Sequence, residues 1–183
     1  MNSGTGGPPL GPGPTPRRQR RLRRLAWAVA LTGLLLDQLS KAWALQHLQP
    51  GQVQALLPGL LQLQRVSNDG AAFSLFTGSV TLLGLVSALV CLALVAWIQW
   101  RPPEAPLLAL AAGLLLAGAA GNGLDRWRSG SVIDFLELVP IHFPIFNIAD
   151  VAINLAVICF LLDLLQSGRS GERSSSHGGE RDG

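Results

Sequence analysis

Acidic residues gather in one stretch of an otherwise apolar chain, from Gly121 to Asn154. The stretch holds four of the 11 acidic residues in the sequence, namely Asp125, Asp134, Glu137 and Asp150. Two aspartates held close together cannot both ionise easily, so one keeps a proton while the other activates a water molecule. Asp134 and Asp150 are the pair best placed to converge, because one lies on a strand-like segment and the other begins an apolar run. The predicted chemistry is therefore attack of water on a peptide bond.

Other hydrolytic chemistries fit the sequence less well. No HExxH motif occurs and the three histidines are scattered, which argues against a catalytic metal. No GxSxG motif occurs, and Ser40 and Lys41, as neighbours on one helix, point apart. Cys91 and Cys159 lie inside apolar runs without an acid–base partner. We therefore expect neither a metal nor a cofactor.

Membrane helices must position these residues. Of the sequence, 49% is hydrophobic and 14% is charged, whereas soluble domains carry about 25% charged residues. The apolar residues come in blocks that are each about long enough to cross a bilayer. We predict an α-helical polytopic membrane protein with four transmembrane helices, at about residues 25–48, 76–100, 107–124 and 145–165.

Two polar segments, about 49–75 and 127–146, connect these helices on the extracytoplasmic side. The first alternates with period two in LQLQRV, and the second contains the strand-like SVIDFLELV. We expect the first to form a small extracytoplasmic β-sheet at the membrane surface. Its end, Gly70-Ala71-Ala72, would let another backbone approach closely, or is simply the end of a hairpin.

The ends of the chain are rich in Gly, Pro, Ser and Arg and cannot bury a core. We predict a disordered basic cytoplasmic tail at 1–24, one membrane domain at 25–166 and a disordered cytoplasmic tail at 167–183. Ten of the 14 Lys and Arg residues fall on the predicted inner side, which places both termini in the cytoplasm.

Six arginines crowd positions 17–24. Such a run is typical of a twin-arginine export signal or a nucleic-acid patch, and with the apolar stretch that follows it also imitates a cleavable signal peptide. We interpret it instead as the positively charged anchor of the first membrane helix.

With this topology, polar residues from five separate stretches fall near the outer membrane boundary. Besides Asp134 and Asp150 they are Asp37, Lys41, Asn68, Asn122, Asp125, Arg126 and Asn147. Carboxylates at a membrane boundary are costly, which marks them as functional candidates.

Two of these groups have a structural interpretation. Asp37 and Lys41 stand four residues apart on one helical face, acid first, which favours an ion pair that neutralises itself. Lys41 is also expected to extend outward to the interface. Asp125 is interpreted as a local ion pair with Arg126 that braces the helix end.

Five short blocks carry a family resemblance. They are DQLSK at 37–41, NDGAAFS at 68–74, GNGLDR at 121–126, VIDF at 132–135 and FNIAD at 146–150. Together they resemble the signature motifs of lipoprotein signal peptidase (signal peptidase II, aspartic peptidase family A8). The matching region covers about residues 25–165.

The resemblance implies an aspartic endopeptidase of the bacterial inner membrane that removes signal peptides from prolipoproteins, on the N-terminal side of a diacylglyceryl-modified cysteine. The implied catalytic residues are Asp134 and Asp150. The implied substrate-binding or supporting residues are Asp37, Lys41, Asn68, Gly70, Asn122, Asp125, Arg126 and Asn147. The partners it implies are prolipoprotein signal peptides, together with membrane lipids. We also expect no nucleic-acid partner and a monomer.

Two functions from other classes remain open. A small proton- or cation-coupled transporter could use Asp37, Lys41, Asp125 and Asp150 as a relay, although such groups usually lie near the midplane of proteins with internal repeats. A scaffold that binds lipoproteins without cleaving them would need a groove but no aspartate pair.

Overall fold

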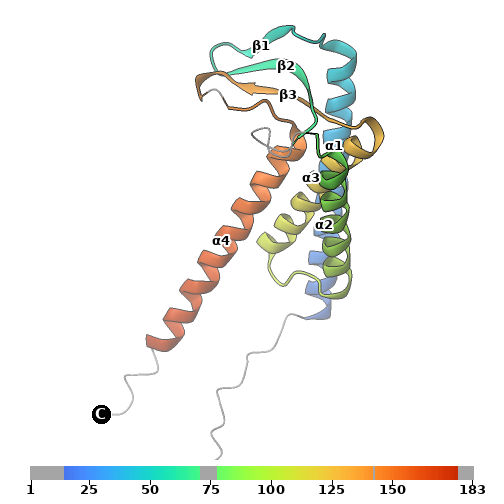
Figure 1. The fold of residues 1–183 in the computed structure, drawn as a ribbon. Helices are drawn as coiled ribbons and strands as arrows, with labels where there is room; N and C mark the ends of the chain where they lie inside the picture. Colours follow the sequence, from blue (N-terminus) through green and yellow to red (C-terminus); the bar gives the residue numbers. More distant parts are fainter. Residues whose placement is uncertain (1–14, 71–77, 142, 177–183) are drawn as a thin grey trace, which may run out of the picture.

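The described part of the chain folds into four long helices and a three-stranded antiparallel sheet, which lies across one end of the helices (Figure 1). The computed structural model describes residues 15–70, 78–141 and 143–176. Its helices are α1 (Pro16–His47), α2 (Val80–Trp100), α3 (Pro106–Ser129) and α4 (Ile148–Ser176). Its strands are β1 (Val53–Leu57), β2 (Leu61–Asn68) and β3 (Val132–Leu138), and a short 3-10 helix, η2 (Val139–Ile141), follows β3.

Helix α1 begins at Pro16, so the basic run does not belong to a disordered tail as expected. Thr15 caps this helix: its Oγ1 accepts a hydrogen bond from the backbone N–H of Arg18 at 3.4 Å. Proline at the first helical position has no N–H to leave unpaired, which suits it to this place. The rest of the two predicted tails, 1–14 and 177–183, lies outside the described residues.

Helix α3 is the central helix of the bundle. Of its apolar window 61% is buried, compared with 17% for α2 and 17% for α4. Its glycines allow the neighbouring helices to come close. A Cβ atom added at Gly113 would lie 2.8 Å from Cβ of Val29 on α1. One added at Gly118 would lie 2.6 Å from the carbonyl oxygen of Ala149 on α4.

Helices α3 and α4 also differ from the sequence prediction at their ends. Helix α3 continues past residue 124 to Ser129 and ends at Gly130, whose φ of 70° is the left-handed cap that glycine adopts readily. Helix α4 begins at Ile148 rather than 145. It continues to Ser176 rather than ending at 165, because no proline interrupts residues 148–176.

The predicted small sheet is confirmed, and it joins the two polar segments. Strands β1 and β2 form an antiparallel hairpin, and β2 pairs with β3 so that Asn68 lies opposite Val132 and Val66 opposite Asp134. The register shifts between Leu63 and Val66, as at a β-bulge. The pairing brings Asn68, at the end of one segment, next to Asp134 in the other.

A small core fixes this sheet to the helices. Leu63 of β2 and Phe135 of β3 are buried together with Ala44 and Leu48 at the end of α1. Because side chains alternate along a strand, Phe135 and its neighbour Asp134 point to opposite faces of β3. Packing of the phenylalanine therefore directs the aspartate to the other face.

Three described helices, α2, α3 and α4, are long and apolar enough to cross a membrane. Helix α1 is not among them, because Asp37, Gln38 and Lys41 interrupt its apolar stretch. Length and composition therefore support three of the four predicted spans.

Candidate active site

Asp134 is held by the side chains of two asparagines. It is only 3% exposed. Asn68 Nδ2 donates to its Oδ2 at 2.8 Å, and Asn147 Nδ2 donates to its Oδ1 at 2.6 Å. Each carboxylate oxygen therefore has an amide donor, one from β2 and one from the start of α4.

Asp150 is fixed in the first turn of α4 by a reciprocal cap. Asn147 Oδ1 accepts from the backbone N–H of Asp150, and Asp150 Oδ2 accepts from the backbone N–H of Asn147, both at 3.0 Å. This is the geometry of a capping box, with aspartate in the place of the usual glutamate. The second oxygen, Oδ1, accepts from Asn122 Nδ2 at 2.8 Å.

A short backbone bridge sets the position of Asn147. The N–H of Phe146 donates to the carbonyl oxygen of Leu136 at 2.9 Å, and the N–H of Leu136 donates back to the carbonyl oxygen of Phe146 at 2.9 Å. The chain entering α4 is thereby attached to β3 next to Asp134. Strand β3 and helix α4 thus bring Asp134 and Asp150 to Asn147, which contacts both.

Asn147 and Asn122 join both aspartates into one buried network. Asn147 is 0% exposed, and its Nδ2 also donates to Asn122 Oδ1 at 3.1 Å. Asn122 in turn contacts Asp150, as described above. Asp134 and Asp150 are thus linked through Asn147, and Asn122 of α3 contacts both Asn147 and Asp150.

Lys41 forms the cationic centre behind these amides. Its Nζ lies 2.9 Å from Asp37 Oδ2 and 2.8 Å from Asp125 Oδ2, and it donates to Asn122 Oδ1 at 3.0 Å. The predicted pair of Asp37 and Lys41 exists, but Lys41 does not extend outward to the interface, since it is only 3% exposed. Two carboxylates and an amide inside the bundle offer it more partners than the surface would.

The partner of Asp125 is Lys41 of α1, so the expected local pair with Arg126 is wrong. Successive helical residues point in different directions, about 100° apart, and Asp125 faces α1. Arg126 instead donates to the carbonyl oxygen of Asn122 at 3.2 Å and to that of Gly70 at 3.0 Å.

Arg126 and Asn68 together hold the turn at Gly70. The backbone N–H of Gly70 donates to Asn68 Oδ1 at 2.9 Å, while its carbonyl oxygen accepts from Arg126. Among the described residues, Nε of Arg126 is buried without a hydrogen-bond partner. The sequence neighbours Ala71 and Ala72, also expected near the substrate, lie outside the described residues.

Asp37 connects the cationic centre to α4. Its Oδ1 accepts from the backbone N–H of Ala149 at 2.9 Å, so it satisfies one of the free donors at the start of α4. Gly121 faces it from α3, where a Cβ atom would meet the carboxylate. This contact explains why a glycine stands at position 121, next to Asn122.

Gln38 belongs to the same network and was missed in the sequence. Its Nε2 lies 3.1 Å from Asp125 Oδ1 and 3.2 Å from Asp37 Oδ2, and its Oε1 accepts from Arg128 at 3.3 Å. A polar side chain between two charged ones in an apolar helix was the available signal. The site residues predicted from the sequence all lie in this network: Asp37, Lys41, Asn68, Gly70, Asn122, Asp125, Arg126, Asp134, Asn147 and Asp150.

Burial makes Asp134 a weaker acid than an exposed aspartate. Loss of solvation, and to a smaller extent the nearby charge of Asp150, raises the pKa of Asp134 from 3.8 to about 6 against the opposing hydrogen bonds from Asn68 and Asn147. Asp134 therefore holds its proton more strongly than an exposed aspartate does. Within the described residues, no group of three or more His, Cys, Asp or Glu could hold a metal ion.

Fold and site together define an integral membrane protein in which the buried Asn147 links two aspartates where a helix bundle meets a small sheet. The Signal peptidase (SPase) II family matches residues 29–166 of this chain. The chain belongs to that family.

Relatives with curated names agree. A lipoprotein signal peptidase of Synechococcus sp. (strain RCC307) is 58% identical over 73% of this chain and 89% of its own length. One of Parasynechococcus marenigrum (strain WH8102) is 51% identical over 85% of this chain and 96% of its own length. A solved structure described as a bacterial membrane enzyme matches with a TM-score of 0.72 at 28% identity, over 86% of this chain and 93% of that one.

Proposed function

We propose that this protein is a membrane aspartic endopeptidase that removes signal peptides from diacylglyceryl-modified prolipoproteins, cutting on the N-terminal side of the lipidated cysteine. Family membership supports signal peptide removal from lipoproteins in a bacterial membrane. The observation that carries the aspartic mechanism is that Asn147 contacts both Asp134 and Asp150, while Asn122 contacts Asp150 and Asn147.

Asp134 is the member of the pair that holds the proton, because burial and Asp150 raise its pKa to about 6. Asp150 is the carboxylate that activates water. It accepts a proton as the water oxygen attacks the carbonyl carbon of the scissile peptide, while Asp134 donates a hydrogen bond to the carbonyl oxygen. When the tetrahedral intermediate collapses, the C–N bond breaks and the leaving amine takes the proton from Asp150.

The cationic centre around Lys41 positions this machinery. Lys41 and Asn147 both contact Asn122 Oδ1, which orients its Nδ2 toward Asp150. Asp37 holds the N-terminus of α4, and Asp125 completes the neutralisation of Lys41. Arg126 and Asn68 hold Gly70, whose backbone would border the substrate.

The membrane arrangement that fits this chemistry has four crossing helices. Helix α1 becomes the fourth span because Asp37 and Lys41 neutralise each other inside the protein and expose no charge to lipid. Both termini are then cytoplasmic, and the sheet with the aspartates lies at the extracytoplasmic face of the bacterial inner membrane. There a monomer meets substrates that are anchored by lipid.

The proposal is tested with purified protein and two matched peptides, one carrying a diacylglyceryl cysteine and one carrying a free cysteine. We expect cleavage of the lipidated peptide directly before the cysteine, insensitive to chelators. Binding of the lipidated peptide without cleavage would support the scaffold interpretation instead. Cleavage of both peptides at equal rates would contradict the proposed substrate.

A further inference from the structure

The first turns of α1 carry six arginines, and the helix places four of them on one face. Arg17, Arg20, Arg21 and Arg24 follow the i, i+3, i+4, i+7 spacing that aligns side chains along a helix. All four are exposed. We call this face the arginine stripe.

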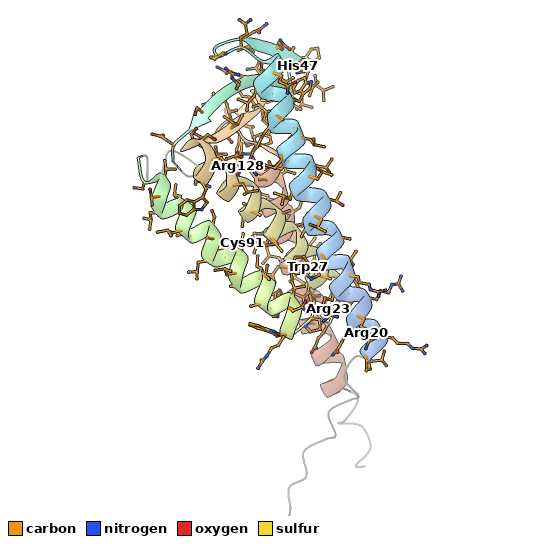
Figure 2. The ribbon with its side chains drawn as sticks, turned by 90° about the vertical axis from the view of Figure 1, so that its right-hand side faces the viewer. Arg20, Arg23, Trp27, His47, Cys91 and Arg128 are labelled. Atoms are coloured by element: carbon orange, nitrogen blue, oxygen red, sulfur yellow. The ribbon has the colours of Figure 1, made fainter. Side chains whose placement is uncertain are left out.

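The arginine stripe is held rigidly and points away from the bundle. Leu22 and Ala26, which fall on roughly the opposite side of α1, are buried against Ile98 of α2 and Ala109 of α3. The helix is continuous from Pro16 through this packed segment. Figure 2 shows Arg20 at the end of α1 that lies farthest from the sheet.

The charge of the stripe is not neutralised within the described residues. The ion pairs found there are those of Lys41 with Asp37 and Asp125. No acidic residue lies in the first turn of α1. The arginines also stand at the positive end of the helix dipole, where cations are unfavourable. An external anion would relieve both effects.

The same helical face identifies that anion as a lipid. Beyond the stripe it continues with Leu31, Leu35 and Leu39, which are 63%, 58% and 58% exposed. Leu31 follows Arg24 by seven residues, about 10 Å along the helix. One face thus changes from cationic to apolar over about the distance that separates phosphate groups from hydrocarbon. A nucleic acid would cover the arginines and leave the leucines in water.

We propose that the arginine stripe is a binding surface for the headgroup phosphates of anionic phospholipids. Four guanidinium groups along two helical turns would contact more than one lipid at a time. The acyl chains of those lipids would then lie along the exposed leucines. This surface lies at the end of α1 opposite to the aspartate pair and does not depend on the proposed cleavage reaction.

The test compares lipid retention by the full-length protein and two variants that lose equal charge. Protein in neutral detergent receives equal amounts of phosphatidylglycerol and phosphatidylcholine, and native mass spectrometry counts the bound lipids. Arg20→Gln/Arg24→Gln removes two charges from the stripe. Arg18→Gln/Arg23→Gln removes two charges from the same turns but from other directions.

We expect wild type to prefer phosphatidylglycerol, and the stripe variant to lose up to about fivefold of this preference per arginine. The control variant should lose clearly less. Higher NaCl should weaken the wild-type preference, because salt screens exposed charges. Equal losses in both variants, or equal retention of the two lipids by wild type, would overturn the proposal. So would tight binding of an oligonucleotide without a preference for phosphatidylglycerol.

Discussion

At the scale of single residues, asparagine amides hold the two aspartates in place. Asn68 and Asn147 donate to Asp134, and Asn122 donates to Asp150. The residue types and their clustering could be predicted from the sequence. The pairings could not, because the choice of Lys41 over Arg126 as partner of Asp125 depends on how α1 packs against α3.

The raised pKa of Asp134 predicts how activity depends on pH. If Asp134 must be protonated, kcat/KM falls as pH rises through about 6. Asn68 stabilises the ionised form, so Asn68→Ala raises the pKa of Asp134 and moves this limb to higher pH. A pH profile of kcat/KM measures the shift, with Ser67→Ala on the same strand as control. A limb that stays in place, or moves to lower pH, would contradict the assignment.

The two buried ion pairs of Lys41 predict that its replacement strongly lowers the stability of the protein. Lys41→Met leaves Asp37 and Asp125 buried without their cation, which costs about 3–5 kcal/mol. Arg65→Met is the matched control, since Arg65 donates only to the carbonyl oxygen of Leu45 near the surface. Thermal unfolding in detergent should show a much lower Tm for Lys41→Met than for Arg65→Met. Similar Tm values in both variants would mean that the buried centre is dispensable.

At the scale of elements, the site depends on how the start of α4 is fixed. Asn147 caps the helix, the Phe146–Leu136 bridge attaches it to β3, and Asp37 binds Ala149 from α1. The existence of four helices and of strand segments was predictable from apolar blocks and alternation. The early start of α1 was missed although Thr15-Pro16 is a recognisable helix start.

The close packing of α3 against α4 predicts that a larger residue at position 118 lowers the cleavage rate. In Gly118→Ala the new methyl group would lie 2.6 Å from the carbonyl oxygen of Ala149, so α4 must shift next to Asp150. A displacement of about 1 Å near reacting groups can cost up to about 100-fold in rate. We expect at least a tenfold loss of kcat by that reasoning. Gly168→Ala on α4, where nothing lies within 4 Å, should keep the wild-type rate.

At the scale of the whole molecule, the proposed catalytic pair lies at one end of the bundle, and the arginine stripe, without an ion pair among the described residues, lies at the other. Figure 1 shows the sheet across the first of these ends. Composition and charge bias were enough to predict a polytopic membrane protein. Length and composition support α2, α3 and α4 as spans but not α1, whose Asp37 and Lys41 pair with each other and with Asp125 of α3.

The proposed topology predicts which sites a membrane-impermeant thiol reagent reaches in intact cells. In a background with Cys91→Ala and Cys159→Ala, Gln54→Cys on the exposed strand β1 should be labelled. Glu104→Cys, in the connection between α2 and α3, should be labelled only after the cells are opened. Labelling of only Glu104→Cys in intact cells would mean that the orientation is reversed. Labelling of both sites in intact cells would contradict the proposed arrangement.

The central claim is that Asp134 and Asp150 act as one catalytic pair. The most direct measurement is the cleavage rate of a diacylglyceryl-modified prolipoprotein peptide by wild type, Asp134→Asn and Asp150→Asn. Glu137→Gln is the matched control, an acid on the same strand as Asp134 whose partner is Gln62. We predict loss of cleavage in both aspartate variants with folding retained, and a near wild-type rate for Glu137→Gln. Cleavage by either folded aspartate variant at the wild-type rate would contradict the account.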